Sequence, residues 1–219
     1  MPDLIIKPTA TSGNKLILKD QAGGAVLTTA DSGATIANAT LASPMVTGNI
    51  SIPNDGNIGS AGDADAISIS SAGYVINSAR PYFSVYGDQA GSGTDVSANA
   101  RIPFNTTTNN NGSHFNTTGH YFTTPIAGVY YFRVQIYHYS GTNTIAYEMK
   151  SHDTSDGDSF ALARLRFTPG GSDNIYFISA SSYLAANRRI SVVNNVGATR
   201  TVYLQSAESH TVFQGCLIG

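Results

Sequence analysis

The stretch Gly128-Val129-Tyr130-Tyr131-Phe132-Arg133-Val134-Gln135-Ile136-Tyr137-His138-Tyr139 decides how the rest of the chain is interpreted. Successive side chains of a strand point to opposite faces, so this run predicts one long β-strand with two different faces. The first face is apolar, and we expect it in the core of a β-sandwich. It consists of Tyr130, Phe132, Val134 and Ile136.

The second face of this strand is aromatic and polar at once. Such a face is costly to leave wholly in water, yet too polar for a dry core. Tyrosine and arginine together are typical of protein interfaces. We therefore predict a contact between subunits, and an outer strand face with scattered tyrosines is the alternative. The residues assigned to this contact are Tyr131, Arg133, Gln135, Tyr137 and Tyr139.

Residues 80–219 are dense in similar runs, separated by loops that carry Gly, Asn or Asp. No window shows the helical period of about 3.6 residues. Many short strands at this spacing predict an all-β sandwich or jelly roll. The polar run of residues 105–118 is interpreted as a loop of hydrogen-bonding groups. The expected strands are 81–86, 100–105, 114–116, 121–123, 128–139, 144–151, 159–168, 175–184, 188–194, 201–205 and 212–218.

The composition changes near residue 80. Residues 1–79 contain one aromatic side chain, Tyr74, whereas residues 80–219 contain the other eleven Tyr and all nine Phe. A segment with so few large side chains cannot build much of a core alone. We therefore predict two parts, an extended arm over residues 1–79 and a compact head over residues 80–219.

The arm nevertheless carries strand signals. Residues 15–19 and 25–28 predict a hairpin around the turn at 20–24, and residues 67–70 alternate before a Gly-containing break. Short strands without their own core need partners, which three identical chains side by side can supply. This predicts a β-rich trimeric stalk or attachment arm, and a flexible linker is the alternative. For residues 34–47 both a helical turn and an extended arm remain open.

The charge pattern excludes several classes of partner. Only 12% of the residues are charged and the formal net charge is −2, so electrostatics gives no reason to expect nucleic-acid binding. No stretch approaches about 18 apolar residues, so no membrane insertion is expected. The first residues carry no charged-then-apolar leader, and we expect a chain made in the cytoplasm without a signal peptide. The single cysteine, Cys216, excludes an internal disulfide.

Signatures of catalysis are absent from the sequence. It has no Gly-x-Ser-x-Gly elbow, no phosphate loop and no His-Glu-x-x-His, and its five histidines are scattered. We therefore expect no enzymatic activity. The best candidate for a cation is the loop of residues 151–159, which carries Asp153, Asp156 and Asp158. Calcium takes six to eight oxygens, some of which neighbouring subunits could add; a solvated turn is the alternative.

Part of the chain resembles a known family, the C1q/TNF-like domain. Its central motif is similar to Asn111-Gly112, Phe115, Thr118-Gly119, Pro125 and Gly128-Val129-Tyr130-Tyr131-Phe132. Its last strand is similar to Phe213-Gln214-Gly215-Cys216-Leu217, with Cys216 where an aromatic residue is usual. The Gly-Asp turn of the family is not evident, since Asn187-Arg188-Arg189 occupies that region. The resemblance spans about residues 81–219 and implies a ten-stranded jelly roll that packs as a homotrimer.

The arm has a second, compositional resemblance. Residues 4–8, 15–26 and 56–69 are similar to virion fibre proteins of tailed phages, in which a C1q-like knob often caps a short fibre. This implies a homotrimeric fibre, spike or decoration protein located in the virion. Residues 1–79 would attach to other virion proteins of capsid or tail, and the head would face a host surface receptor or glycan. The alternative is a bacterial or secreted C1q-like module that binds carbohydrate or protein.

Overall fold

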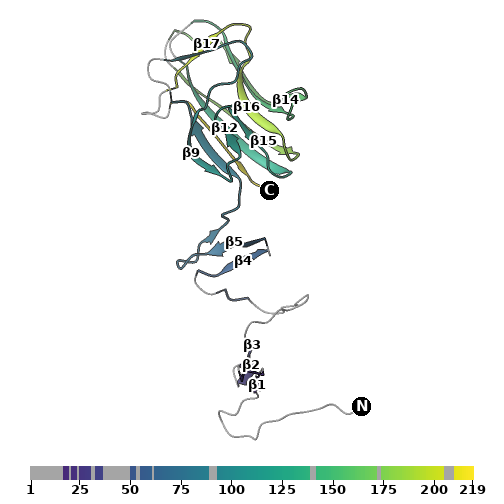
Figure 1. Ribbon diagram of the computed structural model, residues 1–219. Coiled ribbons are helices and arrows are strands. Elements are labelled where there is room, and N and C mark those ends of the chain that lie inside the picture. Colours follow the sequence, from purple (N-terminus) through teal and green to yellow (C-terminus); the bar gives the residue numbers. More distant parts are fainter. Residues whose placement is uncertain are drawn as a thin grey trace. The chain divides into compact units, whose positions relative to one another are not determined.

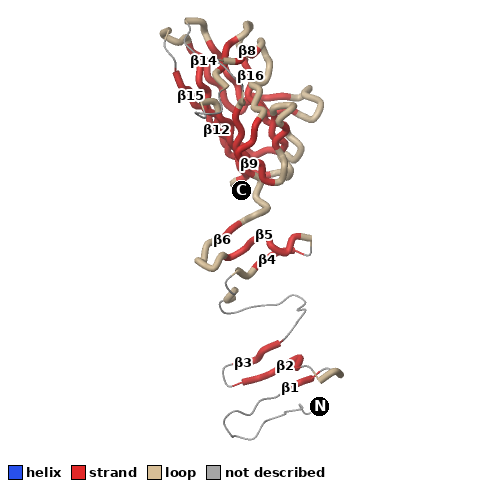
Figure 2. The backbone as a smooth tube through the Cα atoms, turned by 60° about the vertical axis from the view of Figure 1, so that its left-hand side comes forward, coloured by secondary structure: helices blue, strands red, loops and turns tan. Residues whose placement is uncertain are grey.

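The computed structural model contains strands and turns, and no helix within the residues that it describes (Figure 2). It follows that no helix in this part of the chain is long and apolar enough to cross a membrane. The chain divides into two compact units, Met1–Ser51 and Ile52–Gly219. The described residues are 17–19, 21–23, 25–30, 33–36, 50–52, 55–60, 62–88, 93–138, 142–171, 174–204 and 210–219.

The first unit contains one small antiparallel sheet of β1 (Ile17–Lys19), β2 (Ala25–Ala30) and β3 (Gly33–Ile36). The predicted hairpin is confirmed, because Leu18 pairs with Leu27. Of the residues left open in the sequence, 34–36 form part of β3, which pairs with β2, so this segment is extended. Ile17 and Leu18 are exposed.

The second unit begins with another three-stranded sheet, made by β4 (Asn57–Ser60), β5 (Asp63–Ile69) and β6 (Val75–Ile76). The expected break after residue 70 is a turn in which Gly73 has a φ of 82°, a conformation that glycine adopts without strain. Ile58, Val75 and Ile76 are exposed, so this sheet too leaves apolar side chains without cover.

The rest of the second unit is a β-sandwich (Figure 1). In one sheet the order of strands is β10, β11, β16, β13, β14. We call it the outer sheet, and its members are β10 (Phe115–Asn116), β11 (Tyr121–Thr123), β13 (Ile145–His152), β14 (Ser159–Phe167) and β16 (Arg189–Asn194).

The opposite sheet, which we call the inner sheet, is built around β12 (Gly128–His138). Along one side β12 pairs with β15 over its full length, and along the other it pairs with β18, beyond which lie β7 and β9. Near His138 it also meets β17, which pairs with β8. The bounds are β7 (Tyr82–Tyr86), β8 (Thr94–Val96), β9 (Thr106–Asn111), β15 (Asn174–Leu184), β17 (Arg200–Val202) and β18 (Val212–Leu217).

Phenylalanine rings from both sheets fill the core. Phe83 of β7 stacks on Phe122 of β11 at 4.7 Å between ring centroids, and it meets Phe213 of β18 edge-on at 4.9 Å. Phe115 lies 5.1 Å from Phe83, and Phe132 of β12 completes the group. Each buried phenylalanine contributes about 1.5–3 kcal/mol through removal from water. The four side chains of β12 that were expected in the core are all buried, which confirms that prediction.

The strands predicted between residues 94 and 111 were wrong, since the structure has β8 and β9 there instead of a strand over residues 100–105. Residues 100–105 form no strand; they lie antiparallel beside β16 for only a few residues and make one isolated bridge, Arg101 to Val193. The polar run after them was expected as a loop, but its first half forms β9, paired with β7. Thr has a high strand propensity, and pairing with β7 satisfies the backbone of a segment that has little to bury.

Gly215 provides a test of this packing. It lies in β18, and a Cβ atom there would overlap the rings of Phe132 and Phe83. We predict that Gly215→Ala lowers the free energy of unfolding by about 1–3 kcal/mol, because a packed core cannot take up a methyl group. Urea unfolding followed by circular dichroism measures this. The matched control is Gly197→Ala, which has nothing within 4 Å of the new methyl group; equal stability of the two variants would contradict the packing described.

Candidate binding surfaces

The outward face of β12 and β15 carries a row of apolar and aromatic side chains. On β12 the face that was expected to contact another subunit points away from the core, with Tyr131 and Arg133 exposed and Gln135 and Tyr137 half-buried. Tyr139 lies outside the described residues. Among the described residues, Tyr203 and His210 partly cover the Tyr137 end, while Tyr131 and Arg133 are exposed; the role of this face in assembly stays a prediction.

β15 adds side chains that the sequence analysis did not assign to this surface. Phe177 is 53% exposed and Tyr183 69% exposed, and Ile175 also points outward. They stand opposite Gln135, Val129 and Tyr137 of β12. The signal was available in the alternation of residues 174–184, which places Ile175 and Phe177 on one side and Ile178 on the other. We call the combined surface the tyrosine face, made of Tyr131, Arg133, Gln135, Tyr137, Ile175, Phe177 and Tyr183.

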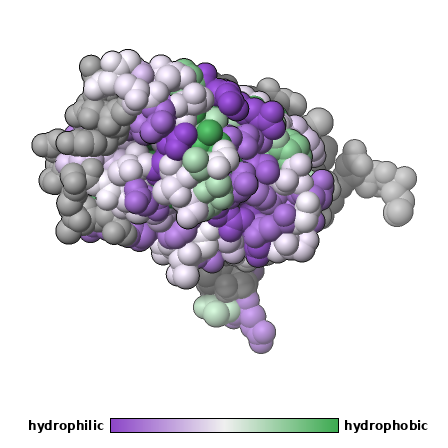
Figure 3. All heavy atoms as spheres, turned by 90° about the horizontal axis from the view of Figure 1, so that it is seen from above, coloured by the Kyte–Doolittle hydropathy of each residue, from purple (hydrophilic) through white to green (hydrophobic). Residues whose placement is uncertain are grey.

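Contacts within the tyrosine face hold its side chains in place. The Arg133 guanidinium lies 4.8 Å from the centre of the Phe177 ring, a cation–π contact. Tyr137 packs against Tyr203 at 5.1 Å and His210 at 4.6 Å. Side chains that are already ordered lose less entropy when a partner covers them. By contrast, the end of the head seen in Figure 3 is mostly hydrophilic, with hydrophobic residues only in small spots.

The second predicted site, the loop with three aspartates, is organised around Asp153. Its carboxylate accepts hydrogen bonds from the backbone N–H groups of Ser155, Gly157 and Asp158 and from the Ser155 hydroxyl. These bonds, led by the one from Asp158, lower the pKa of Asp153 from 3.8 to about 2. Asp153 is therefore occupied as the acceptor that closes its own turn.

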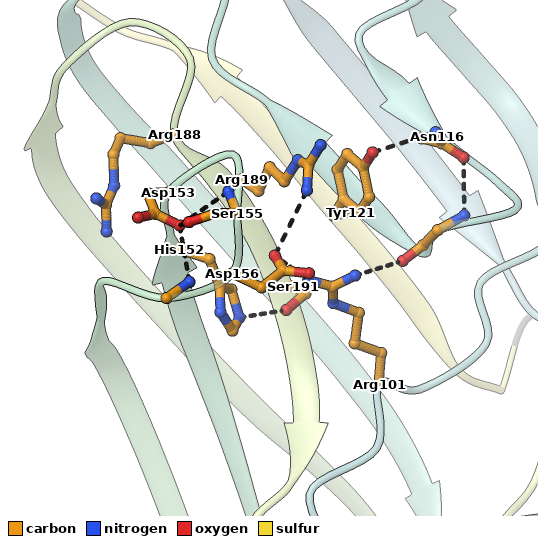
Figure 4. Close-up of polar contacts among 12 residues, drawn as sticks. Arg101, Asn116, Tyr121, His152, Asp153, Ser155, Asp156, Arg188, Arg189 and Ser191 are labelled. Atoms are coloured by element: carbon orange, nitrogen blue, oxygen red, sulfur yellow. Dashed lines mark hydrogen bonds and ion pairs between the residues drawn. The ribbon is translucent and has the colours of Figure 1, made fainter.

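The other two aspartates pair with arginines, and Figure 4 shows the two pairs of Asp156. Asp156 lies 2.6 Å from Arg101 and 3.6 Å from Arg189, and Asp158 lies 2.8 Å from Arg188. Within the described part of the chain, no group of three or more His, Cys, Asp or Glu side chains is placed to hold a metal ion. The geometry thus gives the calcium prediction no support, because each carboxylate has a different partner.

A polar cavity of about 600 Å³ lies beside this loop, on the outward face of the outer sheet. Lys150 and His152 of β13 form its floor, next to Val193 of β16. One wall is the segment with Asn99 and Arg101, held along β16 by hydrogen bonds from Asn99 N and Ile102 N to carbonyls of that strand. Sequence reasoning missed this cavity because its walls come from three separate loops.

The turn of residues 117–120 and the Asp153 loop form the other walls of the cavity. Asn116 Oδ1 accepts the N–H groups of Thr118 and Gly119, and the Gly119 carbonyl accepts a 3.1 Å hydrogen bond from Arg101. The centre of the Tyr121 ring lies 5.0 Å from the Arg101 guanidinium and 4.5 Å from that of Arg189. These contacts tie the three walls together.

His152 and Ser191 meet under the cavity, with His152 Nε2 3.0 Å from the Ser191 hydroxyl (Figure 4). A serine beside an imidazole is the start of a nucleophilic site. Here, however, Ser191 is fully buried, with an exposure of 0%, so no substrate reaches its oxygen. We therefore assign this pair a structural role.

Comparison with known proteins agrees with this architecture. The family model described as "C1q domain" matches residues 83–160. A tumour necrosis factor structure, Eiger of S. frugiperda, is 17% identical, with a TM-score of 0.54, covering 64% of this chain and 93% of its own. The globular domain of zebrafish complement 1qA is 20% identical, with a TM-score of 0.50, covering 64% and 98%. No curated protein sequence matches the chain. The head therefore has an all-β jelly-roll fold of the C1q/TNF type.

The Asp153 turn can be tested through amide exchange. We predict that Asp153→Ala speeds hydrogen exchange at Gly157 and Asp158, because both amides lose their acceptor. Ser155→Ala is the matched control, since it keeps the carboxylate and its three backbone hydrogen bonds. The sign with pH follows from the lowered pKa: the contribution of ionised Asp153 is present above pH 3.8 and is lost as the pH falls through about 2. Exchange that is unchanged by Asp153→Ala would refute this account.

Proposed function

We propose that the chain is a non-enzymatic binding protein that works as a homotrimer, with the tyrosine face of each head packed against its neighbours. The observation that carries this proposal is the exposed pairing of β12 and β15, in which Phe177, Tyr131 and Tyr183 lie on one sheet surface. Contiguous apolar surface of this kind marks interaction sites. The C1q/TNF type of fold supports the assembly as well, since homotrimers are usual for this type of domain.

The composition of the tyrosine face suits a partner that is a second copy of itself. Aromatic residues and arginine are enriched in interface cores, and Arg133 already lies over Phe177. Between the aromatic residues, Ser179 and Ser181 stand opposite Arg133 and Tyr131. Their small side chains let a neighbouring sheet approach closely. The face carries no carboxylate, so a copy packed on it would bury no unpaired negative charge from these strands.

The finer proposal is that the trimer is a virion structural protein, a short fibre, spike or decoration protein of a phage. Its support is the sequence resemblance of the arm to virion fibre proteins and the character of the small sheets. β1 and β4–β6 leave Ile17, Leu18, Ile58 and Val75 exposed, and such strands gain stability when other chains cover them. In this proposal the arm attaches to other virion proteins and the head binds a host surface receptor or glycan.

A bacterial or secreted C1q-like module is the second candidate, and the same head supports it. The two candidate functions differ in the role of residues 1–79, which attach the trimer to a particle only in the virion protein. A free trimer outside cells that is never particle-bound favours the secreted module, whereas co-purification with particles favours the virion protein.

The trimer is tested by mass. Light scattering of the full chain should give about 69 kDa, three times the 22.9 kDa of one chain. We predict that Phe177→Asp reduces this mass to that of one chain, because three unpaired carboxylates buried in the interface cost several kcal/mol each. Phe177 lies outside the core, so circular dichroism of the variant should stay that of a folded β-protein.

Thr199→Asp is the matched control for this variant. It introduces the same charge at an exposed loop position away from the tyrosine face, and should leave the mass at about 69 kDa. A parent chain that stays monomeric at all concentrations, or a trimer that tolerates Phe177→Asp, contradicts the proposed assembly.

The arm is tested by deletion of residues 1–79. All sandwich strands lie between Tyr82 and Leu217, so the remaining head keeps its core and should stay a soluble trimer. We predict that this variant no longer joins the particle, measured by gradient purification of virions that carry a tagged copy. The full-length tagged chain is the control. Incorporation of the shortened chain at the level of the full chain would reject the virion role of the arm.

A further inference from the structure

The cavity on the outer sheet is cationic, although the whole chain has a formal net charge of −2. Arg101 and Lys150 line it, and the only carboxylate in its lining is Asp156. Arg101 and Arg189 both pair with Asp156, so one negative charge is shared between two positive ones. Lys150 makes no ion pair with any described residue, and it is the only lysine after residue 19.

Arg101, one of the two cations, is held before any ligand arrives. Arg101 is fixed by Asp156, by the Gly119 carbonyl and by the ring of Tyr121. Lys150 is half-buried on β13, between the two flanking strands. A positive site built on strands and braced loops loses little entropy when it binds an anion.

His152 forms part of the floor of the cavity. Its side chain is only 7% exposed and lines the cavity, and its Nε2 is engaged with Ser191. Its Nδ1 is buried and has no hydrogen-bond partner among the described residues. Burial keeps a ligand in the cavity from this nitrogen, as it does from the Ser191 hydroxyl, so His152 contributes to the shape of the floor and not a hydrogen bond.

The remaining lining narrows the class of ligand. Asn99, Thr118 and Ser159 add amide and hydroxyl groups around the cations, and Val193 is the apolar contact in the floor. A bare inorganic anion would fill little of about 600 Å³. An anion that carries several hydroxyl groups would contact both the charged and the hydrogen-bonding groups. The volume of the cavity, about 600 Å³, falls within the usual range of small-molecule sites.

We propose that this cavity binds an anionic saccharide unit, a sugar that carries a carboxylate or a sulfate group. Lys150 and Arg101 provide the charge that the acidic group meets, and Asn99, Thr118 and Ser159 bind ring hydroxyls. The cavity is built within one subunit. This inference rests on the proposed function in one respect, that the head is a binding domain. It does not require the trimer.

Calorimetric titration of the full chain tests the proposal with three oligosaccharides of equal length: one with glucuronic acid units, one sulfated and one neutral. One or both acidic oligosaccharides should bind, and the neutral one should bind at least about tenfold more weakly, the effect of losing one charge-assisted hydrogen bond. The comparison of the first two tells which acidic group the site prefers. Lys150→Glu should abolish the preference for acidic over neutral oligosaccharides. Lys150→Gln, which removes the charge but keeps a polar side chain, should weaken that preference.

Arg166→Glu is the matched control. It makes the same change of charge at an exposed position of β14 that does not line the cavity, and should leave the affinity unchanged. Three results would overturn the proposal: equal affinity for acidic and neutral oligosaccharides, equal losses in Lys150→Glu and Arg166→Glu, or inorganic sulfate binding as tightly as the sulfated sugar. Phe177→Asp separates the two proposals, since a monomeric variant should still bind through each cavity, while a variant that stays trimeric refutes only the assembly.

Discussion

The contact on which the head depends is the cluster of phenylalanine rings between the two sheets. Phe83, Phe132 and Phe213 come from the inner sheet, and Phe115 and Phe122 from the outer one, so each ring belongs to a different strand. Ring pairs at 4.7–6.2 Å add about 0.5–1.5 kcal/mol each beyond the area that they bury. Because the cluster joins strands far apart in the sequence, it fixes the registers of both sheets together.

That cluster also determines which surfaces are free to bind. With one face of β12 committed to the core, the strand period of two forces Tyr131 and Arg133 outward, and the full-length pairing with β15 sets Phe177 and Tyr183 beside them. The tyrosine face is thus a direct consequence of the core. A slip of one residue in β12 would bury Arg133 and expose Phe132, which the ring contacts forbid.

Prediction from the sequence succeeded where the pattern was local. The long strand around Tyr130 and Phe132, the strands after residue 140 and the N-terminal hairpin followed from alternation and turn residues. It failed where a strand is specified by its neighbour: β9 is a run of Thr and Asn with no apolar period, and it is a strand because β7 offers a free edge. The chain around Arg101 has the reverse character: it has the apolar residues of a strand, but it pairs with β16 only briefly and then fills the core with Ile102 and Phe104.

The two candidate sites differ in the same way. The tyrosine face could be read from one strand, because its residues are two apart in the sequence. The cationic cavity could not be predicted from one strand, since Arg101, Lys150 and Arg189 are far apart in the sequence. Folding brings Arg101 and Arg189 together at Asp156, and Lys150 lines the same cavity. The three aspartates led to the prediction of a cation site in this loop, and the structure instead places the loop in the wall of the cationic cavity. Asp153 closes the turn and Asp156 positions two arginines, so the acidic loop serves to build a positively charged site. A carboxylate that pairs with fixed arginines at the rim leaves the unpaired cation, Lys150, as the group that faces an incoming anion.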